Sequence, residues 1–374
     1  MEQQAADIIV IGGGIAGVSA AAELASHSKV LLLEQESQLG YHATGRSAAA
    51  LDARYGSDAV QAMTASSQVF FRSPPNGFSE LALIRPRNFL FIAREDQLSR
   101  IKAMRAEDPL LQVLSAEAAC REVPLLSTDY VAGAVQDSRC GDLDVDAIFQ
   151  AYLRLFRRHS GELVCSCKVN SLKFESGRWQ LQCGEKQFHA PIVVNAAGPW
   201  ADTIAELAGI GGLGITPMRR TAVLIDPPPD ANIGNWPMVV DIDEQLYFKP
   251  DAGQLLVSPA DETPSVACDA SPEELDVAIA VDRFKKMTCM EVRRINHRWA
   301  GLRSFAPDRN FVLGFDPRAT GFFWLAGQGG YGVQTAPAVA NLATALITGT
   351  PLTSEFTTLS TLNDVLAPQR LLSQ

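Results

Sequence analysis

The first forty residues constrain the fold more than any other part of the chain. Residues 7–11 form a short apolar run rich in β-branched side chains, which is typical of a strand buried on both faces. The sequence Gly-Gly-Gly-Ile-Ala-Gly follows at 12–17, then a helix of small residues over 18–26 and a second apolar run over 29–33. This order of strand, glycine turn, helix and strand, with G-x-G-x-x-G in the turn, predicts a dinucleotide-binding unit.

Each residue type in this unit has a physical task. The first glycine allows the tight turn, the second lets a pyrophosphate approach the backbone, and the third lets the helix pack closely on the sheet. The N–H groups and dipole of the helix N-terminus then face the phosphates. The acidic residue after the second strand is placed to accept hydrogen bonds from ribose hydroxyls. The cofactor-binding residues predicted here are Gly12, Gly14, Ile15, Ala16, Gly17 and Glu34.

Two later segments favour FAD over NAD as the dinucleotide. Residues 192–198 form another apolar strand that stops at a turn of small residues, which suits a second backbone approach to the cofactor. Residues 321–332 run from a strand into a glycine-rich loop, and 333–347 predict a helix. A second helix N-terminus beside glycines can stabilise negative charge on a reduced isoalloxazine ring, which a nicotinamide does not need.

The remaining segments predict a second domain with a different kind of sheet. The length of 374 residues indicates two domains, or one large discontinuous one, at about 150 residues per domain. Residues 272–286 predict a helix with Ser271 as its N-cap. Short strands separated by Pro, Gly and Asp turns predict a largely antiparallel sheet, at 88–93, 221–225, 238–242, 245–249 and 254–258.

The fold class predicted from these elements is α/β with two domains. A Rossmann-like FAD-binding domain comprises residues 1–82, 141–215 and 300–374 and is therefore discontinuous. A substrate-binding domain with a mixed, largely antiparallel sheet comprises residues 83–140 and 216–299. We expect the substrate pocket where this sheet covers the flavin ring.

The charge of the chain excludes some classes of partner. It has 42 Asp and Glu against 32 Lys and Arg, a formal net charge of −10. An acidic surface repels nucleic acid and anionic membranes. Any anionic ligand must therefore be held by local devices, such as helix N-termini or a few well-placed arginines.

Cysteine spacing and the N-terminus bear on the cellular environment. The seven cysteines form neither a C-x-x-C pair nor a Cys/His cluster at zinc spacing, which predicts reduced thiols and no metal site. The leader carries Glu2 and Asp7 but no Lys or Arg before its apolar stretch, unlike a signal peptide. No uncharged apolar run reaches the roughly 20 residues of a membrane-spanning helix. We therefore expect a cytoplasmic protein without a transmembrane segment.

Longer motifs across nearly the whole chain resemble one family of flavoproteins. They lie at 40–49, 195–198, 236–238, 247–253, 299–305 and 328–332. Together they resemble the D-amino-acid oxidase and glycine oxidase family, and within it the bacterial D-arginine dehydrogenases. The resemblance implies noncovalent FAD, because Cys289 is the last cysteine and precedes the C-terminal segment where some relatives attach the flavin. It also implies cofactor contacts from Thr44, Gly45, Arg46, Ser47, Ala48, Ala197, Gly198, Gly301, Arg303, Gly329, Gly330, Tyr331, Gly332 and Gln334.

The same resemblance implies a carboxylate clamp and a reaction. Arg303 and Arg220 would grip the α-carboxylate of the substrate, and Tyr55, on a mobile lid, and Tyr247 would add hydrogen bonds. A guanidinium suits this role because it pairs bidentately with a carboxylate and keeps its charge when desolvated. Hydride transfer from the α-carbon of a D-amino acid to flavin N5 gives an imino acid, which water hydrolyses to a 2-keto acid and ammonia. This chemistry needs no protein acid, and no His/Asp/Ser or paired-carboxylate constellation stands out in the sequence.

Departures from the D-arginine dehydrogenases bear on the side chain of the substrate. Phe89 stands where they have a glutamate that neutralises a guanidinium, Ala50 where they have a histidine, and Asp52 where they have a threonine. A buried cation beside Phe89 would lack its counter-charge, so we expect a neutral or apolar D-amino acid, or a cyclic or N-alkylated amine acid. If Arg87 faced the pocket an acidic side chain would fit, and Asp52 could instead favour a cationic one. The predicted pocket residues are Ala50, Asp52, Phe89, Met238, Val240, Gly330 and Tyr331.

Two other functions remain open from the sequence. A related flavoprotein could oxidise a 2-hydroxy acid or a polyol phosphate, a reaction that needs a positioned base, usually histidine. The chain could also be a non-catalytic FAD-binding subunit. The electron acceptor, whether oxygen, a quinone or another carrier, is not specified by any motif.

Overall fold

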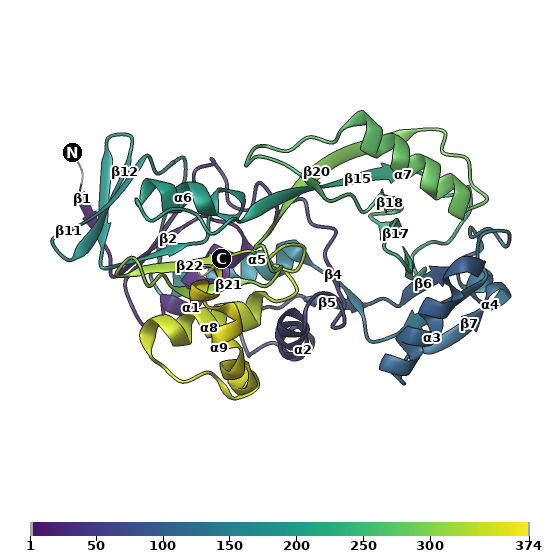
Figure 1. Cartoon of the computed structure of the whole chain (residues 1–374), viewed down its shortest axis with the longest axis horizontal. Coiled ribbons are helices and arrows are strands. Elements are labelled where there is room, and N and C mark those ends of the chain that lie inside the picture. The colour runs from purple at the N-terminus through teal and green to yellow at the C-terminus, as the bar shows by residue number, and fades with distance from the viewer. Residues whose placement is uncertain (1–2, 373–374) are drawn as a thin grey trace.

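The computed structural model describes residues 3–372 of the chain. The molecule is elongated, with the N-terminal strands at one end and the segments around β6 (Phe89–Ala93) and α4 (Ala116–Glu122) at the other (Figure 1). Two long strands, β15 (Thr216–Ile225) and β20 (Ile295–Phe305), pair antiparallel along their lengths and connect the two ends.

A six-stranded sheet carries the predicted dinucleotide unit. Its neighbouring strands are parallel except for the antiparallel pair at one edge. The strands that the sequence predicted as buried apolar runs lie in its centre, and their side chains are buried on both faces. In order across the sheet, the strands are β10 (Glu162–Val164), β3 (Val30–Leu33), β2 (Ile8–Ile11), β14 (Ile192–Asn195), β22 (Phe322–Ala326) and β21 (Val312–Phe315).

Helices cover one face of this sheet, and a smaller sheet covers the other. The helices α1 (Ile15–Leu24), α2 (Asp58–Arg72), α5 (Val145–Arg158) and α8 (Ala336–Thr348) share one apolar core with the sheet. The opposite face packs against α6 (Ala201–Leu207) and four strands, β1 (Gln3–Ala5), β13 (Lys186–Ala190), β12 (Arg178–Cys183) and β11 (Ser171–Glu175).

Two of these helices, α2 and α5, were not expected from the sequence. Each begins at a side-chain cap that satisfies a free backbone N–H of the first turn. Ser57 accepts a hydrogen bond from the N–H of Val60, and Asp144 accepts one from the N–H of Ala147. Helix α5 also buries a continuous apolar face against α1. The two N-cap residues and the apolar periodicity of α5 are therefore local signals that the sequence contains.

A nine-stranded sheet forms the other part of the molecule. It is antiparallel except where β16 (Met238–Asp241) runs parallel to β6, so it is mixed, as expected. Its remaining strands are β19 (Thr263–Pro264), β18 (Gln254–Ser258), β17 (Tyr247–Asp251), β8 (Gly133–Asp137) and β7 (Gln112–Ser115), with β15 and β20. Helices α3 (Leu98–Glu107) and α7 (Glu274–Met287) pack on this sheet, as does the 3₁₀ helix η1 (Glu95–Gln97) beside α3. Helix α9 (Asn363–Leu366) and the 3₁₀ helices η2 (Gly198–Trp200), η3 (Ser354–Leu362) and η4 (Pro368–Leu371) lie with the six-stranded sheet and its helices.

The prediction that Ser271 caps the helix expected over residues 272–286 is wrong. Helix α7 begins at Glu274, and its N-cap Glu273 makes no side-chain capping bond. The carboxylates of Glu273 and Asp276 instead bind the guanidinium of Arg219 on β15. At this helix N-terminus the acidic side chains therefore form an ion pair with another element and do not cap their own helix.

A short three-stranded sheet lies between the two parts. Its strands are β4 (Ala50–Leu51), β9 (Gly141–Leu143) and β5 (Ile84–Pro86), all antiparallel. Residues 52–57 leave β4 and lead into α2, and this segment carries Tyr55. Segment 52–57 therefore lies within reach of side chains from both the six-stranded and the nine-stranded sheet and the helices that pack on them.

The expectation that all cysteines are reduced is wrong for one pair. Cys167 and Cys183 form a disulfide, with their Cα atoms 5.3 Å apart. They are 16 residues apart in sequence, and the fold places the segment before β11 beside the end of β12. Spacing alone could not reveal this pair because it depends on strand pairing.

Within residues 3–372, no helix combines the length and the apolar character needed to cross a membrane.

Candidate active site

The glycine turn after β2 forms the floor of a large cavity. Gly12 has φ of +110°, and a Cβ atom there would lie 2.4 Å from the carbonyl oxygen of Ala196 at the end of β14. Only glycine therefore allows the two strand ends to come this close. Gly14 and Ile15, at the start of α1, line the cavity, so the helix N-terminus faces its interior.

Glu34 occupies the position expected of a ribose-binding acid. It is buried at the end of β3, and its carboxylate accepts hydrogen bonds from the N–H of Gly13 at 2.7 Å and of Glu36 at 2.8 Å. A carboxylate has about four acceptor positions, so these two bonds leave capacity for ribose hydroxyls. The two backbone bonds also fix the orientation of the carboxylate toward the cavity.

The segment 43–48 forms a second wall of the cavity. Thr44 accepts a hydrogen bond from the N–H of Ile15 at 2.9 Å, which attaches this segment to the N-terminus of α1. Arg46 donates to the carbonyl oxygens of Ala270 and Ala300, at 2.8 and 3.0 Å, and pairs with Asp269. The guanidinium of Arg46 therefore joins the cavity wall to the second part of the molecule.

The structure brings most of the predicted cofactor and clamp residues together around this main cavity. Those that line it are Gly12, Gly14, Ile15, Ala16, Glu34, Thr44, Arg46, Ser47, Ala48, Ala197, Gly198, Arg220, Tyr247, Gly301, Arg303, Gly329, Gly330 and Gly332. Four predicted cofactor residues do not line it, and one of them, Tyr331, lines a neighbouring cavity instead. Gly17 packs behind the turn against Gly12, Gly45 hydrogen-bonds to Gly40, and Gln334 is buried with its amide bound to Asp52 and Thr64.

Unpartnered polar atoms in the lining fit a bound dinucleotide. His42 and Ser304 both line the main cavity, and the Nδ1 of His42 and the Oγ of Ser304 are buried without a hydrogen-bond partner among the residues that the structure describes. Buried polar atoms are rarely left unsatisfied, so these two sites call for a ligand or water. Together with the helix N-terminus and the fixed carboxylate of Glu34, the residues present fit FAD.

Arg303 is the central charged group of the site. It lies on β20, and its Nη1 donates to the hydroxyl of Tyr55 at 3.3 Å. A Cβ atom at Gly330 would lie 2.9 Å from the Cζ of Arg303, so the glycine loop leaves room for the guanidinium. Burial opposes its charge, but Tyr55 and Tyr247 raise the pKa of Arg303 on balance. Within residues 3–372, no carboxylate forms an ion pair with it, whereas Arg220 pairs with Glu262.

Arg219 and Arg220 are separated by the geometry of the strand. Successive side chains on β15 point to opposite faces of the sheet. Arg219 forms a buried ion pair with Asp276 at 3.0 Å. Arg220 lines the main cavity and is held by the carbonyl oxygen of Asp261 at 2.7 Å and by Glu262 at 3.2 Å. Only Arg220 is therefore available to a ligand in the cavity.

Tyr247 lies beside both arginines. Burial alone would raise its pKa, but the charges of Arg303 and Arg220 lower the pKa of Tyr247 on balance. The phenol is therefore a strong hydrogen-bond donor, and it becomes anionic more easily than an ordinary tyrosine.

Several predicted pocket residues form an apolar cluster around Tyr247. Phe89, Met238 and Val240 are buried in this cluster, and Ala50 packs against it. Arg87 does not face the pocket, because its guanidinium binds Asp142 and the carbonyl oxygen of Trp236. The alternative in which Arg87 recognises an acidic substrate is therefore wrong.

A second cavity adjoins the main one at Arg220, and we call it the entrance cavity. It is lined by Arg54, Tyr55, Gly56, Arg220, Glu244, Ala260, Glu262, Arg309 and Tyr331. Burial raises the pKa of Glu244 and raises the pKa of Tyr331 to about 12. Asp52, predicted as a pocket residue, lines neither cavity, and its carboxylate accepts from the N–H of Arg54 at 2.8 Å.

Sequence reasoning predicted Arg220 but missed the other charged residues of the entrance cavity, Arg54, Glu244, Glu262 and Arg309. Glu262 binds both Arg220 and Arg309, and Glu244 lies in the turn before β17. None of them belongs to a recognisable motif. Glu244 and Arg309 have positive φ angles of 56° and 62°, and such strained backbone is visible only in three dimensions.

Comparisons with known proteins agree with this geometry. The family model described as DAO: FAD dependent oxidoreductase matches residues 7–346. FAD-dependent oxidoreductase domain-containing protein 1 of Bos taurus is 24% identical, over 91% of this chain and 81% of its own. Glycine oxidase of Bacillus licheniformis is 23% identical, over 94% of this chain and 95% of its own.

Solved structures share the fold at similarly low identity. L-proline dehydrogenase from P. horikoshii superposes with a TM-score of 0.82 at 23% identity, covering 100% of this chain and 99% of its own. Glycine oxidase from Geobacillus kaustophilus superposes with a TM-score of 0.81 at 20% identity, covering 95% of this chain and 98% of its own.

Proposed function

The chain belongs to the DAO family of FAD dependent oxidoreductases, and from this premise we propose that it oxidises the Cα–N bond of a small amino acid. The preferred substrate in this proposal is a D-amino acid with a neutral or apolar side chain, or a related secondary amine acid. A primary amine gives an imino acid, which water hydrolyses to a 2-keto acid and ammonia. An N-alkylated substrate releases the corresponding amine in place of ammonia, and a cyclic substrate gives a cyclic imine. We further propose that the FAD is held noncovalently.

A single observation carries the proposal: Arg303 lines the main cavity, and no carboxylate within residues 3–372 forms an ion pair with it. Its hydrogen bond goes to the neutral hydroxyl of Tyr55. Taking a charge out of water is costly unless an opposite charge meets it. A substrate carboxylate would supply that charge, and the fork of the guanidinium matches it with two parallel hydrogen bonds.

The surrounding residues support a clamp for one end of an amino acid. Arg220 lines the same cavity and adds a second positive charge. The hydroxyls of Tyr247 and Tyr55 can donate to the same carboxylate. The apolar cluster of Phe89, Met238 and Val240 packs against Tyr247 without lining either cavity, and it gives this side of the site an apolar character.

The protein's part in the reaction is orientation and charge compensation. Bound FAD supplies the two-electron oxidising chemistry that side chains lack. Arg303 and Arg220 hold the carboxylate, which restricts rotation of the substrate and brings its α-hydrogen to one position.

The printed names of similar proteins support an amine acid as the substrate. Glycine oxidase of Bacillus licheniformis, sarcosine dehydrogenase of Homo sapiens and L-proline dehydrogenase from P. horikoshii are named for a primary, an N-methylated and a cyclic amino acid. These names include a primary amine and two secondary amines, so the proposal covers both classes. Preference for the D configuration rests on the sequence resemblance alone.

A second candidate function is oxidation of an alcohol. Glycerol 3-phosphate dehydrogenase of Caloramator mitchellensis is 22% identical over 89% of this chain, and a phosphate could also pair with the arginines. Alcohol oxidation needs a positioned base, usually histidine. Among the described residues, His42 is the histidine that lines the main cavity. Its Nε2 binds Glu36, so it lies near Glu34, the residue expected to bind the ribose, at that end of the cavity. This arrangement favours the amine reaction.

A third possibility is an FAD-binding subunit without catalysis. The pyruvate dehydrogenase phosphatase regulatory subunit of Mus musculus is 22% identical over 88% of this chain, although only 40% of that relative is covered. Such a protein would retain its flavin colour with every substrate.

Anaerobic mixing with a panel of substrates separates the three candidates. The panel contains D- and L-amino acids with small, apolar, acidic and basic side chains, N-methylglycine, proline, 2-hydroxy acids and glycerol 3-phosphate. The amine proposal predicts bleaching of the flavin absorbance by amine acids and formation of a 2-keto acid. Bleaching by hydroxy compounds alone selects the alcohol reaction, and bleaching by none of them selects the non-catalytic subunit.

A further inference from the structure

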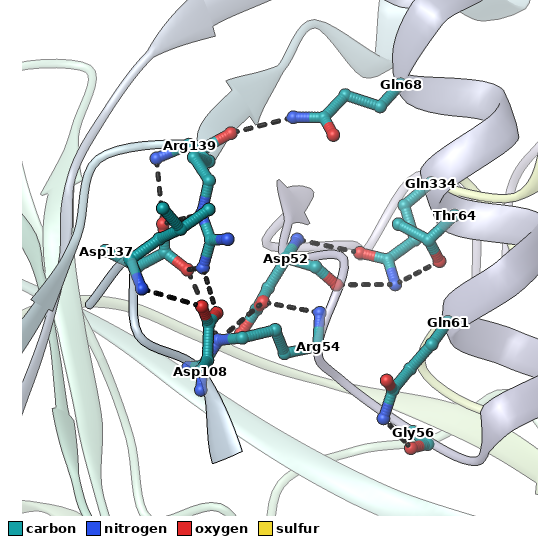
Figure 2. A network of polar contacts seen from close by, with 11 residues as sticks. Asp52, Arg54, Gly56, Gln61, Thr64, Gln68, Asp108, Asp137, Arg139 and Gln334 are labelled. Carbon is teal, nitrogen blue, oxygen red and sulfur yellow. Dashed lines mark hydrogen bonds and ion pairs between the residues drawn. The ribbon is translucent and has the colours of Figure 1, made fainter. Parts of the chain in front are cut away.

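Tyr55 lies next to a network of charged residues outside the clamp. Tyr55 is the hydrogen-bond partner of Arg303, and its ring packs edge-on against Tyr331 with 4.9 Å between centroids. It belongs to segment 52–57, which contains no regular secondary structure. Something other than helix or strand hydrogen bonds must therefore fix its position. Figure 2 shows the groups that do so.

On one side the segment is attached to α2 and to the residue Gln334 just before α8, which both pack on the six-stranded sheet. The side-chain oxygen of Gln334 accepts from the N–H of Asp52 at 3.2 Å, and its nitrogen donates to the hydroxyl of Thr64 at 3.0 Å (Figure 2). Gln61 of α2 donates to the carbonyl oxygen of Gly56 at 3.0 Å. These bonds hold the two ends of the segment, before and after Tyr55, but not its middle.

On the other side, Arg54 attaches the middle of the segment to the nine-stranded sheet. Its Nε lies 3.2 Å from the Oδ2 of Asp137, at the end of β8, and its guanidinium lies over the ring of Phe91, 5.1 Å from the centroid. Asp137 is buried, and Arg139 binds the same carboxylate from the far side. Asp108 in turn pairs with Arg139 (Figure 2).

Guanidinium groups already face the carboxylates of this network, which argues against an added ion. Asp52, Asp137 and Cys140 offer ligand atoms within 4.8 Å of one another, but Arg54 and Arg139 already face these carboxylates. A planar guanidinium that is both stacked and ion-paired has little rotational freedom. Arg54 therefore restricts the backbone of the residue that follows it, which is Tyr55.

We infer that Arg54, held by Asp137 and Phe91, is a positioning residue that fixes the Tyr55 hydroxyl against Arg303 for substrate binding. The inference rests on the proposed function. Arg54 lines the entrance cavity next to Tyr55 and Arg220, so it acts at the point where a carboxylate would enter. It contributes to capture of the substrate rather than to the oxidation step.

The test compares substrate affinity with the rate of oxidation in the FAD-loaded protein. Anaerobic rapid mixing gives the apparent dissociation constant of the best amino acid and the limiting rate of flavin reduction. Arg54→Met should raise the dissociation constant about tenfold and leave the limiting rate within about twofold of wild type. Arg54→Lys keeps the charge toward Asp137 and should restore part of the affinity. Asp282→Asn breaks an exposed ion pair with Lys286 outside the network and should behave as wild type.

A double-mutant cycle with Tyr55→Phe identifies the route of the effect. If Arg54 acts through the Tyr55 hydroxyl, Arg54→Met should cost little further affinity in the Tyr55→Phe background. Additive effects, an unchanged dissociation constant in Arg54→Met, or equal losses of affinity and rate would each overturn the inference. If wild type is not reduced by any amino acid, the proposed function fails and this inference fails with it. Arg54→Lys supplies the comparison if Arg54→Met does not fold.

Discussion

The Nη1 of Arg303 lies 3.3 Å from the hydroxyl of Tyr55, although 248 positions separate the two residues in the chain. The contact joins a long strand of the second sheet to the irregular segment before α2. It places a charged group and a hydrogen-bonding group at the boundary of the main and entrance cavities.

Replacing Arg303 should weaken the binding of every carboxylate substrate to a similar degree. Arg303→Ala removes the charge that pairs with the carboxylate, and we expect a loss of about 3 kcal/mol, roughly a hundredfold in the dissociation constant. Titration of the flavin absorbance with acetate measures this without turnover. Arg298→Ala, at an exposed pair with Glu274, serves as the matched control and should bind as wild type. An unchanged affinity in Arg303→Ala would show that the carboxylate binds elsewhere.

The neighbouring arginines on β15 should give opposite phenotypes. Arg219→Met leaves the buried carboxylate of Asp276 without its partner and should lower the free energy of unfolding by about 3 kcal/mol, with substrate affinity retained. Arg220→Met should raise the dissociation constant of the substrate about tenfold and change stability by less than about 1 kcal/mol. Urea unfolding and flavin titration measure the two effects. The same phenotype from both variants would contradict the assignment of opposite faces.

Binding of a carboxylate should weaken at alkaline pH because of Tyr247. Arg303 and Arg220 lower its pKa below the ordinary value of 10 on balance. Its deprotonated form is anionic and loses its donor, so it repels an incoming carboxylate. Affinity for acetate should therefore be highest below this pKa and should fall as pH rises through it. Acetate has no amine to titrate in this range, and Tyr247→Phe should remove the alkaline loss. Persistence of the same loss in Tyr247→Phe would assign it to another group.

The disulfide predicts the number of free thiols. Unfolded but unreduced protein should react at five cysteines, and reduced protein at all seven. Replacing Cys167 and Cys183 together by serine should cost about 3 kcal/mol of stability, because the bond closes a loop of 16 residues in the unfolded chain. Cys289→Ser, at an exposed and unbonded position, is the control. Seven reactive thiols before reduction would contradict the pairing.

The FAD-binding part was the most predictable because its signals are local. The glycine turn and the apolar runs predicted as strands at 7–11 and 29–33 specify their own conformations, and the structure has strands at Ile8–Ile11 and Val30–Leu33. Family membership confirms FAD as the cofactor. Helices α2 and α5 were missed because their signals, an N-cap and an apolar stripe, were not read.

The charged surroundings of the site could not be predicted because they are made by contacts across the fold. Adjacent arginines are indistinguishable in sequence until the strand assigns their faces, as with Arg219 and Arg220. Asp52 was expected in the substrate pocket, and in the structure it turns toward Arg54 and Asp137. Burial raises the pKa of Asp52, and no local pattern signals that burial. The assignments of individual site residues and of the domain boundaries remain predictions.

The most direct test of the clamp compares an amino acid with its amide. D-alanine and D-alaninamide have the same α-carbon and amine, but only the first has a carboxylate for Arg303 and Arg220. Mixed anaerobically with the FAD-loaded protein, D-alanine or another small amino acid from the panel should bleach the flavin, and the matching amide should fail to do so at the same concentration. Equal bleaching by the acid and the amide would contradict the account, because the guanidinium groups would then not be what holds the substrate.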